Sequence, residues 1–245
     1  MPSKVVSFRL TGEFAAFKDP SVTTNQTVSY IPSKMAVVGI LGAMLGVPRS
    51  EKFTERYSPR YLDLLAKVKI GIAVTAKSEK TVFYTNHRSF KEAKTKPVKS
   101  ELLVRPQYTI YVFSEDQDIV DQLFSRASQG EFVFPPYLGH AYCPAMVSDA
   151  ELHDARTVTG QFTTPTVVLD EESVNGESSV DPHLLTSSSV AIGDLLYHFI
   201  DGGELSARAL RHWIPIASTF LVEFTAKPKF VAVLKLDDGS VVCLY

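Results

Sequence analysis

The chain has 245 residues, of which 45% are hydrophobic and 21% are charged, as in an ordinary globular protein rather than a disordered or fibrous one. A net charge of −2 argues against a protein that coats DNA, and two cysteines are too few for a disulfide framework. No apolar run reaches the ~20 residues of a membrane span, and the N-terminus lacks a cleavage signal, so we expect a cytoplasmic protein with no membrane partner.

The first 145 residues alternate between strand and helix patterns. Two segments have helical patterns, the apolar residues 33–45 and residues 116–129 with apolar side chains on one face, and they end at Gly46 and Gly130. Four shorter segments have the composition or alternation of strands, and these are residues 6–10, 68–74, 108–113 and 131–134. The order predicts an α+β domain over residues 1–145 with the ferredoxin-like (RRM-like) β-α-β-β-α-β arrangement.

The first helix begins with a potential anion site. Ser33 and the free N–H groups of the first turn, together with Lys34, could bind a phosphate. On the loop after the first strand, Phe14 and Phe17 could stack on a base while Lys18 pairs with its phosphate; the alternative is that both rings belong to the core. The helix glycines do not lie between a strand and a helix, so we interpret Gly39, Gly42 and Gly46 as close-packing positions.

Over twenty residues separate the strand that ends near Tyr84 from the one that starts near Tyr108. Segments of this length in a compact domain are usually functional or mobile. The composition favours a basic β-hairpin arm, or thumb, inserted at about residues 85–105; a solvated, disordered loop is the alternative. The basic residues of this arm are Arg88, Lys91, Lys94, Lys96, Lys99 and Arg105.

Residues 146–245 predict a smaller, β-rich C-terminal region. Residues 151–205 carry a net charge of −9, and a flexible acidic insertion is expected at about 170–190. Two alternating strands around Asp238-Gly239 predict a closing hairpin.

No nucleotide-binding loop, dinucleotide fingerprint or metalloprotease motif occurs in the chain. His140, Cys143 and His153 do not have the spacing of a zinc site, so no metal or cofactor is expected. A metal-independent ribonuclease needs a base, an acid and a cation for the phosphorane. A cluster on the arm could supply these groups, but it is equally typical of a phosphate-binding arm; its members are Tyr84, His87, Arg88 and Lys91.

Three motifs, in this order, resemble the CRISPR-associated family five of the RAMP superfamily. They are F-R-L-x-G-x-F-A-x-F on the first strand, P-S-K before the apolar helix, and F-P-P-Y-L-G after the predicted fourth strand. The resemblance covers about residues 4–145, with the basic arm in the matching place. It implies a subunit of the type I Cascade surveillance complex, a prokaryotic ribonucleoprotein for antiviral defence.

The resemblance implies a non-catalytic role in which the chain binds and caps the five-prime handle of the crRNA. Its partners would be the Cascade backbone subunit, the large subunit and, through the complex, target DNA. The arm would act as a thumb against the backbone subunit, and residues 137–140 would complete the handle pocket or pack beneath it. The expected RNA-binding residues are Phe14, Phe17, Lys18, Ser33, Lys34, the six basic residues of the arm, Tyr137 and His140.

Two alternatives stay open. One branch of the family is a metal-independent endoribonuclease that processes CRISPR repeat RNA, with a tyrosine after the first helix and an adjacent Lys-His pair. This chain has no Lys-His dipeptide, and its first helix runs into Gly46-Val47-Pro48 without a tyrosine. The other alternative is a scaffold that contacts only proteins, through the acidic segment.

Overall fold

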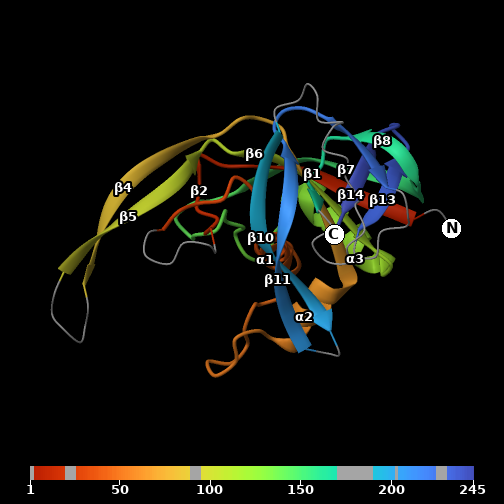
Figure 1. Cartoon of the computed structure of the whole chain (residues 1–245). Coiled ribbons are helices and arrows are strands. Elements are labelled where there is room, and N and C mark those ends of the chain that lie inside the picture. The colour runs from red at the N-terminus through yellow and green to blue at the C-terminus, as the bar shows by residue number, and fades with distance from the viewer. Residues whose placement is uncertain (1–2, 20–25, 89–94, 170–189, 202–203, 225–230) are drawn as a thin grey trace.

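A six-stranded antiparallel sheet forms the centre of the computed structural model, which describes residues 3–19, 26–88, 95–169, 190–201, 204–224 and 231–245 (Figure 1). The strand order is β14-β13-β7-β1-β6-β3. These strands are β1 (Ser3–Thr11), β3 (Val68–Val74), β6 (Gln107–Ser114), β7 (Met146–Thr157), β13 (Ala232–Leu236) and β14 (Val241–Leu244). Beyond β14, the backbone of Tyr245 exchanges two 2.9 Å hydrogen bonds with Ile70 of β3, so the two edges of the sheet meet there.

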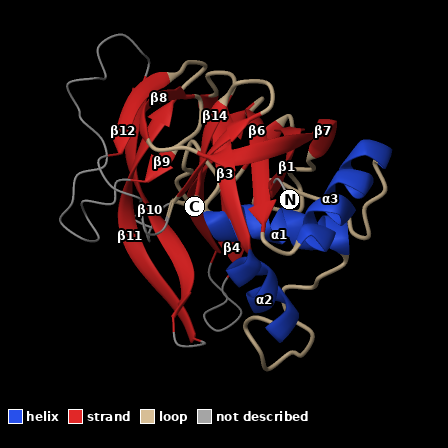
Figure 2. Cartoon of the chain, turned by 90° about the vertical axis from the view of Figure 1, so that its right-hand side faces the viewer, coloured by secondary structure: helices blue, strands red, loops and turns tan. Residues whose placement is uncertain are grey.

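The three helices lie together on one side of the sheet (Figure 2). They are α1 (Lys34–Leu45), α2 (Pro59–Lys67) and α3 (Gln117–Gln129). Phe8 and Leu10 of β1, Leu41 of α1 and Leu123 of α3 are fully buried in the same core. Successive side chains of a strand point to opposite faces, so the core side of β1 is the side of Phe8 and Leu10.

The ends of α1 are those that the sequence predicts. Ser33 is the N-cap, and its Oγ accepts a hydrogen bond from the Ala36 N–H at 3.3 Å. Gly46 ends the helix in the left-handed conformation with φ 73°. Between the two caps, most side chains of this helix are buried, Val37, Leu41 and Met44 among them. This burial explains why the segment contains so few charged residues.

The predicted fourth strand at residues 131–134 is wrong, because this segment has no strand structure. The N–H of Phe134 instead donates to the Ala43 carbonyl at 2.9 Å, one of the terminal carbonyls of α1 that have no partner inside the helix. The strand that pairs with the free side of β1 is β7. β7, β13 and β14 therefore extend the β1 sheet across the boundary expected between residues 145 and 146.

The basic segment forms the expected hairpin, longer than predicted. β4 (Glu79–Arg88) and β5 (Thr95–Val104) pair along their whole length and extend away from the rest of the protein (Figure 1). Short β2 (Phe14–Ala15) pairs with β5 at the base of this arm. Lys80 braces the base: its Nζ donates to the Val28 carbonyl at 2.7 Å and lies 4.7 Å from the centre of the Tyr30 ring.

The C-terminal region is rich in strands, and these contribute to several sheets. The strands outside the central sheet are β8 (Gly160–Thr164), β9 (Val168–Leu169), β10 (Val190–Asp201), β11 (Glu204–Pro215) and β12 (Phe220–Phe224). The closing hairpin predicted around Asp238-Gly239 is present as β13 and β14. The predicted acidic insertion lies outside the described residues, except for position 190 at the start of β10.

Taken together, the fold is a mixed α/β, strand-rich fold with few helices. Within the described residues, no helix is both long and apolar enough to span a bilayer. α2 and the long β10–β11 hairpin were not predicted from the sequence.

Candidate functional site

A pocket of about 790 Å³ opens over the outer side of α1. Three small residues of the helix, Ala36, Gly39 and Ala43, line it at helical spacing. A Cβ atom built on Gly39 meets no other atom within 4 Å. Gly39 is therefore not the close-packing position expected from the sequence; it leaves the pocket floor open.

The other two helix glycines do allow close packing. A Cβ atom on Gly42 would lie 2.7 Å from the Val47 carbonyl oxygen, and Gly46 holds the left-handed turn that ends α1. This turn directs Val47 and Pro48 along the pocket wall. The three glycines thus have different roles: Gly39 leaves the pocket floor open, Gly42 allows close contact with Val47, and Gly46 forms the turn that ends α1.

The two phenylalanines predicted to stack on bases, Phe14 and Phe17, differ in burial. Phe17 is only 3% exposed and its ring packs edge-on against Tyr108, with 6.2 Å between ring centres, so it belongs to the core, and it also lines the pocket. Phe14 is 41% exposed and pairs with Val104 at the base of the arm. Lys18 is exposed and lines the pocket, as an anion-binding residue should.

Of the two residues predicted to form an anion site at the start of α1, one lines the pocket and the other does not. Ser33 lines the pocket while its Oγ caps the helix. Lys34 is only 6% exposed and is not among the lining residues. Burial, and then the charge of nearby Lys69, lowers the pKa of Lys34 to about 8. Its side chain therefore does not strengthen an anion site shared with Ser33, as the sequence had suggested.

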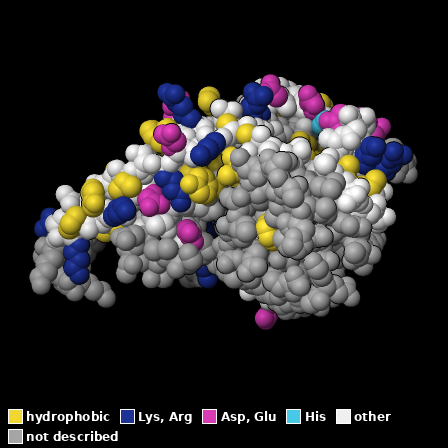
Figure 3. Space-filling model, turned by 45° about the horizontal axis from the view of Figure 1, so that its top comes forward, with side chains coloured by type: hydrophobic (Ala, Val, Ile, Leu, Met, Phe, Trp, Pro, Cys, Tyr) yellow, Lys and Arg dark blue, Asp and Glu magenta, His cyan; other side chains and the backbone are white. Residues whose placement is uncertain are grey.

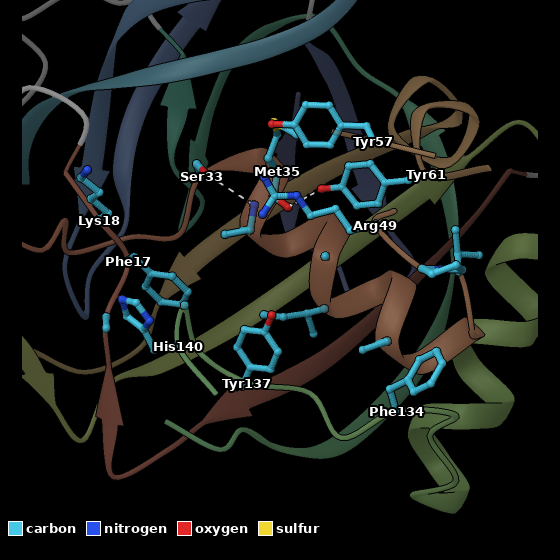
Figure 4. A pocket seen from close by; sticks show the side chains of 18 of the residues that line it. Phe17, Lys18, Ser33, Met35, Arg49, Tyr57, Tyr61, Phe134, Tyr137 and His140 are labelled. Atoms are coloured by element: carbon cyan, nitrogen blue, oxygen red, sulfur yellow. Dashed lines mark hydrogen bonds between the residues drawn. The ribbon is translucent and has the colours of Figure 1, made fainter. Parts of the chain in front are cut away.

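Tyr137 and His140 form the opposite side of the pocket (Figure 4). The His140 ring is stacked on Tyr142, with 5.0 Å between centres and 6° between planes. Gly139 has φ 89°, and a Cβ atom there would collide with the Ala16 carbonyl. Glycine is needed at this position because the Gly139 backbone lies directly against the Ala16 carbonyl and leaves no room for a side chain.

Two arginines and two tyrosines are among the pocket residues that were not predicted from the sequence. Arg49 and Arg56 place their guanidinium carbons 5.0 and 5.4 Å from the centre of the Tyr57 ring. Tyr57 is in turn stacked on Tyr61, with 5.8 Å between centres and 13° between planes. The segment R-S-E-K-F-T-E-R-Y has the composition of a polar loop, and the contact between positions 49 and 57 is made through space, so no periodicity could have revealed it.

Ser58 fixes these residues to the protein. Its buried hydroxyl donates to the Pro48 carbonyl at 2.7 Å and accepts the Tyr61 N–H at 3.2 Å, while its own N–H donates to the Arg49 carbonyl at 2.6 Å. The Tyr61 hydroxyl donates to the Met35 carbonyl at 2.8 Å. Burial raises the pKa of Tyr61 above its ordinary value, so this hydroxyl keeps its proton and its hydrogen bond at neutral pH.

The pocket is suited to an anion that carries flat rings. Lys18, Arg49 and Arg56 are its charged residues, and none of the described lining residues is Asp or Glu. Figure 4 shows Arg49 extending past Tyr61 toward the start of α1, with Tyr57 beside it. Cations combined with exposed aromatic rings are typical of proteins that bind single-stranded nucleic acid.

The predicted arm residues lie away from the pocket. Arg88 and Lys96 are exposed and Lys99 is half-buried; Lys91 and Lys94 lie outside the described residues. Arg105 is paired with Glu13 at 3.4 Å. Figure 3 shows Lys and Arg side chains spread along the arm among hydrophobic ones.

The arm cluster considered for ribonuclease chemistry is only partly described. Tyr84 is 72% exposed and Arg88 lies on the same strand, whereas Lys91 and the side chain of His87 are outside the description. In the described part of the chain, no group of His, Cys, Asp and Glu could hold a metal ion.

A family model described as CRISPR-associated protein (Cas_Cas5) matches residues 5–204. No match is found among curated protein sequences. The crystal structure of a CRISPR protein from Archaeoglobus fulgidus aligns over 98% of this chain and 98% of that chain, with a TM-score of 0.61 and 12% identity.

Two further solved structures align less closely. A chain of a CRISPR RNA-guided surveillance complex covers 91% of this chain and 94% of its own length, with a TM-score of 0.48 and 15% identity. A chain of the type III-B Cmr-beta complex bound to cognate target RNA and AMPPnP covers 89% and 86%, with a TM-score of 0.45 and 10% identity. The Archaeoglobus protein therefore shares the fold of this chain.

Proposed function

The chain belongs to the CRISPR-associated Cas5 family, and from this premise we propose that it is a non-catalytic subunit of a type I CRISPR effector complex that binds and caps the five-prime handle of the crRNA. The observation that carries the proposal is the pocket over α1. Three cations face it, no carboxylate lines it in the described residues, and tyrosine rings stand beside the cations. These groups suit the phosphates and bases of single-stranded RNA.

The arrangement of elements supports the same assignment. We assign the β7-β1-β6-β3 part of the sheet, with α1 between β1 and β3 and α3 between β6 and β7, to the ferredoxin-like arrangement. In this arrangement the segment after β1 and the start of α1 are neighbours. Lys18 and Ser33 accordingly line one pocket although they are separated along the chain.

The arm is the second element of the proposed role. It combines exposed cations with exposed apolar side chains, Val82 and Tyr84, and it is fixed at its base by Lys80. A braced arm of this composition can contact both a protein neighbour and the RNA backbone. We propose that it contacts the backbone subunit of the complex, while handle binding is assigned to the pocket.

A metal-independent endoribonuclease is the second candidate function. The observation that favours it is that the pocket gathers Tyr57, Arg49 and His140, groups that can transfer a proton or stabilise a phosphorane. The binding role is preferred because, within the described residues, His140 contacts the Tyr142 ring by stacking and Arg49 contacts the Tyr57 ring by a cation–π interaction, and neither contact is the hydrogen bond that joins a nucleophile to its base.

One experiment separates the two candidates. Labelled CRISPR repeat RNA and the isolated five-prime handle are incubated with the protein in EDTA, alone and in the assembled complex, and analysed on native and denaturing gels. We expect retention of the handle and intact RNA, with weaker binding at higher salt. A discrete cut would replace the binding role by the nuclease, and an unprotected handle in the assembled complex would overturn RNA capping and favour a protein-only scaffold.

A further inference from the structure

We propose that Arg49 and Arg56 form a phosphate-binding pair for the RNA backbone and that Tyr57 is the positioning residue that holds both guanidinium groups at the pocket. This inference rests on the proposed function, because it assumes that the pocket binds RNA. It assigns the binding to residues that neither the family motifs nor the sequence analysis had singled out.

The first step in the argument is the shared ring. Both guanidinium carbons lie within 5.4 Å of the centre of the Tyr57 ring, inside the range of a cation–π contact. Arginine is suited to this arrangement because its planar group can stack on a ring while its N–H groups bind an anion. One aromatic side chain thus orders two cations that are seven positions apart in the sequence.

The second step is that both charges are available. In the described part of the chain, no carboxylate lies within ion-pair distance of either arginine, although Glu51 and Glu55 belong to the same loop. Glu51 is 3.9 Å from Arg60, and the Glu55 carboxylate accepts the Lys52 N–H at 3.0 Å. The acids of the loop are therefore directed to other partners, and the two pocket arginines keep their full charge for a ligand.

The third step is rigidity. Tyr57 is stacked on Tyr61, the Tyr61 hydroxyl is bonded to Met35 of α1, and Ser58 bonds the backbone of Pro48 and Arg49. Lost side-chain freedom is a large part of the cost of binding, about 0.5–1.5 kcal/mol for each long side chain that is immobilised. Two arginines already ordered by Tyr57 lose less of this freedom when phosphates bind.

The test is the salt dependence of handle binding. The apparent dissociation constant of the five-prime handle is measured between about 50 and 200 mM salt for the wild type, Arg49→Gln, Arg56→Gln and the double variant. Each phosphate contact to a single strand contributes about 0.7 to the slope of log K against log salt, so each single variant should lower the slope by about 0.7 and the double variant by about 1.4. Lys52→Gln is the matched control, because Lys52 is exposed, belongs to the same loop and does not line the pocket; its slope should equal that of the wild type.

The positioning role of Tyr57 has its own readout. Tyr57→Phe keeps the ring and should bind the handle as the wild type does, whereas Tyr57→Leu removes the ring and should weaken binding about 5- to 20-fold, with the slope retained or only slightly lowered. Thermal unfolding of each variant shows whether the fold is intact. If the slopes of Arg49→Gln and Arg56→Gln match that of Lys52→Gln, or if Tyr57→Leu binds like Tyr57→Phe, the inference is wrong.

The same data distinguish this failure from that of the proposed function. A wild-type protein that does not bind the handle in the assembled complex overturns the proposed function. A wild-type protein that binds the handle with a slope insensitive to both arginines leaves the function standing and overturns only the phosphate-binding pair.

Discussion

Ser7 and His153 are joined by a hydrogen bond of 2.9 Å between the serine hydroxyl and the imidazole Nε2, on the face of the sheet opposite the Phe8 side of β1. The second ring nitrogen, Nδ1, lies 3.2 Å from Oδ1 of Asp237 in the turn between β13 and β14. Ser7 and His153 are both buried. These contacts tie the C-terminal hairpin to β7 and β1.

The first prediction concerns the pH dependence of this contact. Desolvation acts to raise the pKa of Asp237, but the hydrogen bonds from His153 and from the backbone outweigh it and hold the pKa below its usual value. A lowered carboxyl pKa stabilises the fold above the unfolded value of about 3.9, and this stabilisation is lost as the pH falls through the folded-state pKa. Asp237→Asn should therefore unfold at a lower denaturant concentration than the wild type at pH 7, and the difference should shrink toward pH 3.

Asp121→Asn, at an exposed ion pair with Lys4, is the control and should show no comparable change. A loss of stability in Asp237→Asn that does not depend on pH would contradict the prediction.

The second prediction tests the open floor of the pocket. Gly39→Leu places a side chain in free space on α1, and the better helix propensity of leucine should raise the free energy of unfolding by about 0.5–1 kcal/mol. The same side chain fills the pocket, so handle affinity should fall at least about tenfold. Gly39→Ala is the control, with a similar gain in stability and nearly unchanged affinity. Tight binding by the leucine variant would show that RNA does not enter the pocket.

The third prediction concerns the buried lysine. Because the pKa of Lys34 is lowered to about 8 in the folded state, the unfolded chain binds more protons between about pH 8 and 10.5, and stability should rise with pH in this window. Lys34→Met should remove that rise and increase the free energy of unfolding at pH 7 by about 1–3 kcal/mol. Chemical denaturation of both proteins at pH 7, 8.5 and 10 measures the difference.

Handle binding by Lys34→Met gives a second readout. Lys34 does not line the pocket, so affinity at pH 7 should stay within about twofold of the wild type. A large loss of affinity in a stable variant would restore Lys34 to the anion site expected from the sequence.

The fourth prediction concerns the contact between the two walls of the pocket. Gly139→Ala forces a side chain into the Ala16 carbonyl at a φ of 89° and should destabilise the protein by about 2–4 kcal/mol while weakening handle binding. Gly160→Ala is the matched control: its φ is 96°, and its Cβ meets nothing within 4 Å, so it measures the backbone strain alone. Equal losses of stability in the two variants would show that the close approach to Ala16 is unimportant.

The fifth prediction separates the two phenylalanines. Phe17→Ala removes a core ring and should cost about 3–5 kcal/mol, whereas Phe14→Ala should cost less than about 1 kcal/mol because the ring is partly exposed. Phe14→Ala is thus the variant in which an effect on RNA binding can be measured in a folded protein. Similar unfolding midpoints for the two variants would contradict the assignment of Phe17 to the core.

The sequence predicts the elements whose signals are local. Ser33 and Gly46 mark both ends of α1, and the apolar alternation of residues 68–74 matches β3 residue by residue. β7 was missed because exposed residues and residues that are at least partly buried are mixed on both of its faces, so it carries little apolar alternation. Residues 131–134 have the apolar and aromatic composition of a strand, but the N–H of Phe134 donates to a carbonyl of α1 instead of to a neighbouring strand.

The residues of the pocket also differ in whether a local sequence signal predicts them. Five predicted residues line the pocket, because each adjoins a motif that can be recognised in the sequence, and these are Phe17, Lys18, Ser33, Tyr137 and His140. The Phe17 ring packs against Tyr108 of β6, and the buried Lys34 lies near the charge of Lys69 of β3, neither of which residue type alone reveals. The contacts of Arg49 and Arg56 depend on a turn held by Ser58, and the sequence gives no signal for them. Whether the predicted residues bind RNA is decided by the experiments above.

The pairing between Tyr245 and Ile70 limits how this protein can be joined to others. A strand with a free edge can recruit a strand from another chain, and at Ile70 the outer edge of β3 is already occupied by the backbone of Tyr245. A neighbouring chain therefore cannot extend the central sheet at that point by strand addition. Tyr245 is buried, so a change that moves its backbone away from Ile70 would uncover this edge of β3 and make strand addition possible there.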